Sequence, residues 1–443
     1  MKIVIIGNGI AGTNAARFIR KNSDHEILMI SSESEYPYSR TALMYVYMGH
    51  MKWEHTKLYE DNFWQKNRIS ILKDRVIKIE PDHKKIYVQS GNEIRYDKLI
   101  LATGSKSNFF GWPGQDLNGV QGLYHLQDLE SMESRTVDGI QRAVIVGGGL
   151  IGIEMAEMFH SRKIPVSFLV REHSFWSNIL PAEESEMINR HIRIQGIDLR
   201  LGEELKEIKG ENKVECVIAK SEQIIDCQFV GITVGVSPNI EFVKNSEIET
   251  AIGILVNNYL ETNVVDVYAI GDCAELRTPN AGRRNIEAIW YTGRIMGQTV
   301  ASTICGNKKT YDPGIWFNSA KFFDIEYQVY GYVPTKDEKT ESLYWEHKNG
   351  LHSIRLVYNK ETEKILGFNL MGVRYRHEVC EKWIKDETKL EKVIENLSLA
   401  NFDPEFFNEY ESEICHMYNQ RFNKILQLKK TRNLDSALQF LNS

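Results

Sequence analysis

Two stretches with the same pattern decide the fold: KIVIIGNGIAG at residues 2–12 and RAVIVGGGLIG at residues 142–152. Each begins with an apolar run, continues with G-x-G-x-x-G and passes into a stretch of helical character. A second apolar run follows each motif, at residues 27–30 and at residues 166–170. The order strand, glycine-rich turn, helix, strand is that of a βαβ unit. The sequence therefore predicts an α/β protein with two Rossmann-like units.

The glycine spacing points to a ligand of the first unit. In the motif at residues 7–12, the first glycine permits a tight turn, the second lets a pyrophosphate approach the backbone, and the third lets the helix pack on the strand. An acidic residue about 20 positions later usually binds the ribose hydroxyls, and Glu33 lies at that spacing. The alternative for Glu33 is an exposed loop glutamate. The predicted dinucleotide site contains Gly7, Gly9, Ala11, Gly12 and Glu33.

Length, composition and charge narrow the function classes. The 443 residues, 42% hydrophobic and 26% charged, fit a soluble globular chain of two or three domains. No stretch approaches the roughly 20 apolar residues of a membrane helix, and glycines follow the apolar run at residues 2–6, unlike in a secretion signal. The net charge of −6 disfavours a nucleic-acid binder. Six cysteines without a C-x-x-C pair disfavour zinc and predict a cytoplasmic protein without a bound metal.

Two further segments resemble a known family. LILATGSK at residues 99–106 and TNVVDVYAIGDCAE at residues 262–275 resemble the A-T-G and T-x-x-x-x-x-Y-A-x-G-D signatures of the flavoproteins called pyridine nucleotide disulfide oxidoreductases. The resemblance implies FAD in the first unit, with Asp272 at the ribityl chain and the Val76 backbone at the adenine edge. The other residues implied to line the FAD are Ala102, Thr103, Gly104 and Gly271.

The same resemblance implies NADH or NADPH as the ligand of the second unit. TVGVSPN at residues 233–239 resembles the family's G-x-x-P-N turn, which closes this domain. Glu154, on the helix after the motif, is implied to reach toward the nicotinamide and the flavin. A solvated helix glutamate is the alternative. The expected NAD(P)H site contains Gly147, Gly149, Ile151, Gly152 and Gly235.

The end of the second strand of this unit bears on the choice of nicotinamide cofactor. A carboxylate there accepts a hydrogen bond from a free 2′-hydroxyl and repels a 2′-phosphate. Val170 occupies that position, and Arg171 follows it. Arg171 matches the position of a phosphate-binding arginine in NADPH-dependent glutathione reductases, and a guanidinium suits phosphate geometry. We therefore expect NADPH rather than NADH, and Glu172 beside Arg171 weakens this preference.

A missing thiol separates the chain from the disulfide reductases of the family. Those enzymes relay electrons from the flavin to cysteine, but the corresponding segment, EYPYSRTALMYVYMGH at residues 35–50, has Thr41 at the thiol position. The segment resembles the P-Y-x-R-x-x-L of a thiol-free branch, which includes rubredoxin reductases, ferredoxin reductases and the flavin module of nitrite reductases. The resemblance implies Arg40 beside the FAD; a surface salt bridge is the alternative. Trp316 resembles a tryptophan that covers the flavin, with core packing as the alternative.

After about residue 311 the sequence changes to strand-like runs, a hairpin around residues 359–363, and then helical spacing. A C-terminal α+β domain is therefore expected. The family dimerises through this region, which implies a homodimer. The expected boundaries are 1–112 and 241–312 for the FAD-binding domain, 113–240 for an NAD(P)H-binding domain inserted in it, and 313–443 for the C-terminal domain.

Two basic clusters in the C-terminal region suggest an acidic partner, and the second also suggests an anionic membrane surface; solvated charge is the alternative for both. The first cluster is Arg374, Arg376 and His377, and the second is Arg421, Lys424, Lys429, Lys430 and Arg432.

Together, these features predict an FAD-dependent NAD(P)H oxidoreductase. Hydride passes from the nicotinamide to the flavin, and electrons leave without a redox-active disulfide. The expected acceptor is a small redox protein similar to rubredoxin or ferredoxin. Two alternatives stay open at this point: an NAD(P)H oxidase or quinone reductase, and a flavoprotein that acts as a redox sensor or scaffold.

Overall fold

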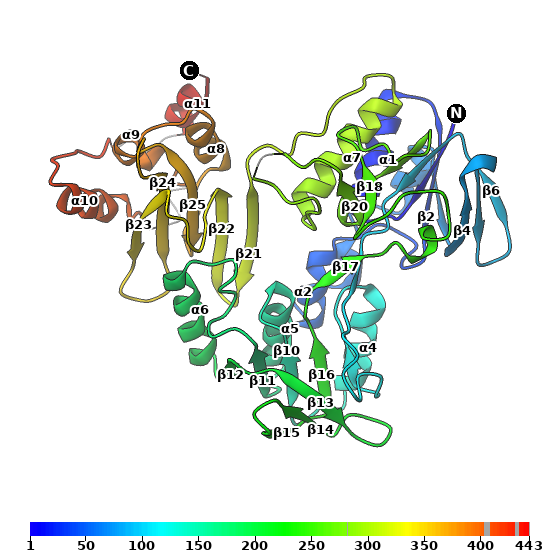
Figure 1. The fold of residues 1–443 in the computed structure, drawn as a ribbon, viewed down its shortest axis with the longest axis horizontal. Helices are drawn as coiled ribbons and strands as arrows, with labels where there is room; N and C mark the ends of the chain where they lie inside the picture. Colours follow the sequence, from blue (N-terminus) through cyan, green and yellow to red (C-terminus); the bar gives the residue numbers. More distant parts are fainter. Residues whose placement is uncertain (281, 403–407, 430–433, 443) are drawn as a thin grey trace. The chain divides into compact units, whose positions relative to one another are not determined.

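The strand that precedes the first glycine-rich motif belongs to a parallel sheet near the N-terminus (Figure 1). The computed structural model describes residues 1–280, 282–402, 408–429 and 434–442. The sheet order is β19-β7-β1-β2-β3, and each strand pairs with its neighbours in parallel. Its strands are β1 (Lys2–Ile6), β2 (Glu26–Ser31), β3 (Ile69–Lys73), β7 (Lys98–Leu101) and β19 (Val267–Ala269). Helix α1 (Ile10–Asn22) connects β1 to β2, which confirms the first predicted βαβ unit.

The apolar run of β1 forms a strand because a parallel sheet that is covered on both faces buries every side chain. Ile3, Val4 and Ile5 are fully buried. Helix α1 packs closely against helix α7 (Trp290–Ile304): a Cβ on Gly297 would lie 2.5 Å from the carbonyl oxygen of Ala11. A larger residue at position 297 would therefore push the two helices apart.

The second motif follows β10 of a second parallel sheet, which has the order β12-β11-β10-β16-β9. Its strands are β9 (Val120–Gln121), β10 (Ala143–Val146), β11 (Val166–Val170), β12 (Asp198–Leu201) and β16 (Phe229–Ile232). The helices in this part of the chain are α4 (Leu126–Thr136), α5 (Leu150–Ser161) and α6 (Ala182–Ile194). An antiparallel meander follows, formed by β13 (Leu205–Lys209), β14 (Cys216–Ala219) and β15 (Ile224–Asp226). The predicted pair of Rossmann-like units is confirmed.

The C-terminal sheet is antiparallel, with the order β21-β22-β25-β24-β23. Its strands are β21 (Phe317–Phe322), β22 (Ile325–Gly331), β23 (Thr340–Glu346), β24 (Ser353–Asn359) and β25 (Ile365–Met371). The helices are α8 (His377–Lys385), α9 (Leu390–Glu395), α10 (Glu411–Phe422) and α11 (Leu434–Asn442). Trp383 of α8 stacks on Phe368 of β25 with ring centroids 6.0 Å apart, so the helix covers the sheet. The expected α+β region and its hairpin are confirmed.

The shorter strands form three small sheets, with the orders β4-β5-β6, β17-β8 and β18-β20. The strands are β4 (Val76–Glu80), β5 (Lys85–Val88), β6 (Glu93–Arg95), β8 (Ser105–Ser107), β17 (Val236–Pro238), β18 (Ile254–Val256) and β20 (Ala274–Leu276). The helices are α2 (Leu43–Tyr47) and α3 (Asn62–Lys66).

The chain forms two compact units. Unit 1 consists of Met1–Gly147, Met158–Val166 and Leu205–Pro313. Unit 2 consists of Gly148–Glu157, Ser167–Glu204 and Gly314–Ser443. The three expected domains have other boundaries, and those boundaries stay a prediction. Among the helices that the structure describes, none has the length and apolar character needed to cross a membrane.

Candidate functional site: a nucleotide cradle in unit 1

The first glycine-rich turn joins β1 to α1. Gly7 has a φ of +113°, and a Cβ there would lie 2.1 Å from the carbonyl oxygen of Ala102, so only glycine fits. A Cβ on Gly12 would lie 2.1 Å from the carbonyl oxygen of Gly7. A Cβ on Gly9, in contrast, would meet no atom within 4 Å. The turn is therefore packed against backbone atoms at Gly7 and Gly12, and it is open at Gly9.

Helix α1 starts at this open position. Its N-cap, Gly9, has no side chain that could cap the first N–H groups, and its first turn carries no acidic residue. The first N–H groups and the positive end of the helix dipole favour an anion at such an end. Ala11 lies in the same turn, where a Cβ on Gly271 would lie 3.0 Å from the Ala11 Cβ. The cradle therefore fits the pyrophosphate of a dinucleotide.

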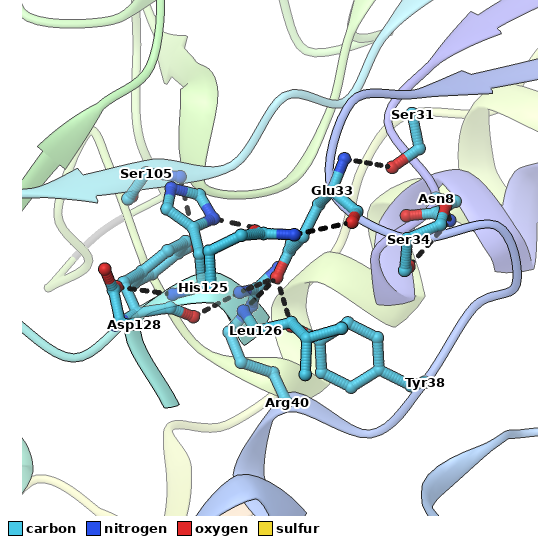
Figure 2. Close-up of polar contacts among 12 residues, drawn as sticks. Asn8, Ser31, Glu33, Ser34, Tyr38, Arg40, Ser105, His125, Leu126 and Asp128 are labelled. Carbon is cyan, nitrogen blue, oxygen red and sulfur yellow. Dashed lines mark hydrogen bonds and ion pairs between the residues drawn. The ribbon is translucent and has the colours of Figure 1, made fainter. Parts of the chain in front are cut away.

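Glu33 follows β2 and lies at the centre of a cluster of donors (Figure 2). Arg40 pairs with both of its carboxylate oxygens, at 3.0 Å to Oε1 and 2.8 Å to Oε2. The Leu126 N–H donates to Oε1 at 2.8 Å, and the Tyr38 hydroxyl donates to the same atom. His125 Nδ1 lies 3.4 Å from Oε2. These contacts use the roughly four lone-pair positions of a carboxylate.

These contacts stabilise the negative charge of the Glu33 carboxylate. Burial by itself would raise its pKa, but the hydrogen bond from His125 and the positive charge of Arg40 lower the pKa well below its usual range. The Glu33 side chain is 11% exposed, so the alternative of an exposed loop glutamate is wrong. The Arg40 side chain is 32% exposed and does form a salt bridge, but within the predicted site. For Glu33 to accept ribose hydroxyls, at least one present donor must release it.

Asp272 lies beside Gly271, whose φ is +72°. Its Oδ2 accepts hydrogen bonds from the Tyr124 hydroxyl at 3.0 Å and from the Ser105 hydroxyl at 3.2 Å. Burial raises the pKa of Asp272, and the hydrogen bonds from Tyr124 and Ser105 oppose this rise. The carboxylate is therefore held in a defined direction by two donors.

The A-T-G segment lies between the first turn and Asp272. Ala102 contacts Gly7 as described above, and the Thr103 hydroxyl donates to the carbonyl oxygen of Asn239 at 2.8 Å. A Cβ on Gly104, which has a φ of +66°, would lie 3.0 Å from the Tyr124 hydroxyl oxygen. The predicted FAD residues of the first turn, the A-T-G segment and the G-D segment thus meet in unit 1.

Val76 begins β4, pairs with Val88 of β5 and is buried in the core of unit 1. Trp316 precedes β21 in unit 2, is half-buried, and its carbonyl oxygen accepts a hydrogen bond from the Gly331 N–H at 2.8 Å. The roles implied for Val76 at the adenine and for Trp316 over the flavin stay predictions.

The predicted NAD(P)H residues show a similar division between packed and open glycines. Gly147 has a φ of +115°, and a Cβ there would lie 2.5 Å from the carbonyl oxygen of Thr233. A Cβ on Gly149 would meet no atom within 4 Å. Ile151 and Gly152 lie in the first turn of α5, which carries no acidic residue. Gly235 has a φ of +96°.

In unit 2, Gly148 approaches the end of β11, since a Cβ on it would lie 2.6 Å from Cγ1 of Val170. Arg171 follows; its side chain is 71% exposed and pairs with Glu172 at 2.8 Å. The predicted phosphate-binding guanidinium is therefore accessible and also has a carboxylate partner.

Glu154 lies on α5 in a different environment. Burial and the neighbouring Glu157 raise its pKa to about 7, and Lys321 opposes this rise. Glu157 forms an ion pair with Lys321 at 2.7 Å. A freely solvated glutamate would not show such a shift, and the role implied for Glu154 at the nicotinamide stays a prediction.

All six cysteines are free thiols. Burial raises the pKa of the thiols of Cys216, Cys227, Cys273, Cys380 and Cys415, that of Cys227 to about 12. A raised pKa suppresses the thiolate that redox chemistry requires. Thr41, at the thiol position of the disulfide reductases, is exposed.

The side chains of the first basic cluster make contacts within their own unit. Arg374 forms an ion pair with Glu326. Arg376 donates to the carbonyl oxygen of Leu399 at 2.9 Å. The His377 ring packs against Phe317, with ring centroids 4.7 Å apart. These side chains do not form a free positive patch.

The second basic cluster is also paired where it is described. Arg421 lies 3.6 Å from Glu341, Lys424 lies 3.4 Å from Glu391, and Lys429 lies 3.5 Å from Glu395. Lys430 and Arg432 lie outside the described residues.

Sequence patterns did not point to Tyr38, Ser105, Tyr124 and His125 as members of the site. Tyr38 belongs to the quoted P-Y-x-R segment, which is a signal that could have found it. Tyr124 and His125 lie far along the chain from their partners: Tyr124 is 148 residues from Asp272, and His125 is 92 residues from Glu33. No local pattern marks them.

Known proteins resemble this chain over most of its length. The model of the family "Pyridine nucleotide-disulphide oxidoreductase" matches residues 1–302. Rubredoxin-NAD(+) reductase of Pseudomonas putida is 31% identical over 313 residues, 69% of this chain and 80% of that protein. An NADH oxidase of Methanocaldococcus jannaschii is 30% identical over 339 residues, 74% of this chain and 75% of that protein. The solved ferredoxin reductase for the CYP199A2 system of Rhodopseudomonas palustris has a TM-score of 0.77 and 25% identity, covering 84% of this chain and 91% of that chain.

Proposed function

This chain belongs to the pyridine nucleotide-disulphide oxidoreductase family, and from that membership we propose that it passes electrons from NAD(P)H through FAD to a small redox protein, without a redox-active disulfide. One observation carries the proposal: the first glycine-rich turn, the A-T-G segment and the G-D segment lie together in unit 1, while the segment at residues 35–50 has no cysteine. When bound, FAD supplies the chemistry, since it accepts a hydride from the nicotinamide and releases electrons to an acceptor.

The side chains of unit 1 would bind and orient the cofactor. The N-terminus of α1 and the open position at Gly9 suit the pyrophosphate. Asp272 offers a fixed carboxylate to the hydroxyl groups of the ribityl chain. Glu33 accepts ribose hydroxyls in exchange for a donor that it holds now, and Arg40 places a positive charge near the phosphates.

The proposed electron donor is NADPH. Position 170 carries valine instead of the carboxylate that would repel a 2′-phosphate, and the adjacent Arg171 is accessible. Glu154 is the proposed nicotinamide-positioning residue of α5. Its pKa of about 7 means that it can hold or release a proton at neutral pH.

The proposed acceptor follows from the relatives named as rubredoxin and ferredoxin reductases. Oxygen is a second candidate, because a relative at 30% identity is named NADH oxidase. A cytoplasmic location and a homodimer formed through the C-terminal region belong to the same proposal.

Anaerobic stopped-flow spectroscopy tests the proposal. The yellow protein is reduced with NADPH or NADH and then mixed with oxygen, a quinone, a rubredoxin or a ferredoxin. Fast bleaching by NADPH, followed by fast reoxidation with rubredoxin or ferredoxin alone, is the expected result. Fast reoxidation by oxygen would support the oxidase instead, and bleaching without any fast acceptor would contradict the reductase proposal and favour a redox sensor.

A further inference from the structure

Tyr124 contacts two parts of the nucleotide cradle at once. It lies two residues before α4, and its hydroxyl donates to Asp272 Oδ2 at 3.0 Å. Its ring lies under the Arg40 guanidinium, with 4.4 Å from Cζ to the ring centroid. Its carbonyl oxygen also accepts a hydrogen bond from Arg40. Tyr124 is therefore in direct contact with both the acidic group and the basic group of the predicted FAD site.

The direction of the tyrosine hydroxyl is set by a third contact. The Ser105 N–H donates to the Tyr124 hydroxyl oxygen at 2.9 Å. A phenol has one hydrogen to donate. Since the Ser105 N–H occupies an acceptor position of this oxygen, the phenol hydrogen points to Asp272. Tyr124 and the Ser105 hydroxyl both bond to Oδ2, which fixes the direction of the carboxylate.

The charge of Asp272 depends on the same neighbours. Burial raises its pKa, and the donors Tyr124 and Ser105, together with the positive charge of Arg40, lower it. Cys273 follows directly and is itself buried, with a raised thiol pKa. Loss of the Tyr124 hydroxyl would remove a donor that favours the charged carboxylate.

We propose that Tyr124 is a positioning residue that holds the Asp272 carboxylate ready for the ribityl hydroxyls of FAD. This role rests on the proposed function, because it requires that Asp272 contact FAD. A carboxylate that is already oriented loses less conformational freedom when the ligand binds. The affinity for FAD is therefore higher. The contribution belongs to cofactor binding and not to the hydride step.

The test is titration of the deflavinated protein with FAD, followed by flavin fluorescence between pH 5 and pH 8. Tyr124→Phe is expected to raise the Kd for FAD about tenfold, the effect of one hydrogen bond to a charged group. The pH at which affinity falls on acidification should also move upward, because Asp272 then takes up a proton more readily.

Tyr87→Phe is the matched control. The Tyr87 hydroxyl donates to a carboxylate oxygen of Glu80 at 2.9 Å, in a strand of unit 1 outside the cradle. This variant removes the same type of hydrogen bond, and it should leave both the Kd for FAD and its pH dependence unchanged.

A double variant separates positioning from general stability. In the Asp272→Asn background, adding Tyr124→Phe should weaken FAD binding by no more than about twofold, because the carboxylate that it positions is already gone. An equal tenfold loss in both backgrounds would overturn the proposal, as would an unchanged Kd and pH dependence for Tyr124→Phe alone. If the unaltered protein binds no FAD, the proposed function itself is contradicted, and the role of Tyr124 falls with it.

Discussion

At the scale of single residues, a local sequence pattern identifies the position, and residues distant in the sequence form its surroundings. Gly7 and Gly9 differ by two positions, yet one is enclosed by the backbone of Ala102 and the other is open. The glycine motif predicted both. Glu33 was predicted from spacing, but its five donors come from residues whose proximity depends on the fold. A prediction for an individual side chain therefore requires both the sequence pattern and the contacts that the fold creates.

Arg171 decides the proposed cofactor preference. Arg171→Ala should raise the KM for NADPH about tenfold, because a charge-assisted contact to the 2′-phosphate is lost. The KM for NADH should change less than twofold. Steady-state kinetics with both cofactors measures the effect, and Glu172→Gln, which frees Arg171 from its partner, should lower the KM for NADPH. Equal changes with NADPH and NADH after Arg171→Ala would contradict the preference.

Glu154 links stability to pH. Its pKa in the folded state is raised to about 7, so folding favours the protonated form. Stability is therefore lost as the pH rises from the ordinary glutamate range toward 7, and it stays lost above 7. The free energy of unfolding of Glu154→Gln, compared with that of the unaltered protein, should therefore increase by about 1–3 kcal/mol between pH 5 and pH 8. Urea unfolding of both deflavinated proteins at pH 5 and pH 8 measures these free energies. If the difference between the variant and the unaltered protein is the same at both pH values, the raised pKa of Glu154 is contradicted.

At the scale of elements, a buried ion pair joins α6 to the C-terminal sheet within unit 2. Arg355 of β24 donates to Glu184 at 2.7 Å and 2.8 Å, and to Glu183 at 2.7 Å. Glu184 is fully buried, and Asn369 of β25 also donates to it at 3.1 Å. A buried carboxylate of this kind requires its partner.

Arg355→Met should therefore lower the free energy of unfolding by about 3 kcal/mol, because it leaves Glu184 buried without its cation. Arg421→Met removes an exposed arginine 3.6 Å from Glu341 and should cost less than about 1 kcal/mol. Urea denaturation followed by circular dichroism compares the two variants. Similar losses for both would show that the buried pair contributes no more than a surface one.

At the scale of the whole molecule, the proposed electron path avoids thiols. A variant with all six cysteines replaced by alanine should reduce an artificial dye with NADPH at a rate within about twofold of the unaltered protein, because the flavin itself performs the transfer. Dye-reduction kinetics, normalised to bound FAD, measures the rate.

Cys273 provides a simpler variant if the complete replacement does not fold. It is the only cysteine in the G-D segment, next to Asp272. Cys273→Ala should also retain the dye-reduction rate per bound FAD. A variant that keeps its FAD but loses this activity would refute the thiol-free path.

Local patterns in the chain were sufficient for the architecture. The two apolar runs with G-x-G-x-x-G predicted the parallel sheets, because the tight turn and the close helix packing leave no alternative to glycine at Gly7 and Gly12. The hairpin around residues 359–363 was predicted for a similar reason, since turn residues separate two strand-like runs. These features depend on neighbours within a few residues.

The polar network of the cradle required the tertiary structure. Tyr124 reaches Asp272 across 148 residues of sequence, and Leu126 reaches Glu33 across 93. The basic clusters were visible in the sequence, but the carboxylates that neutralise Arg374 and Lys424 lie on other elements. Backbone conformation follows largely from adjacent residues, whereas hydrogen bonds and ion pairs between side chains depend on which distant elements the fold brings together.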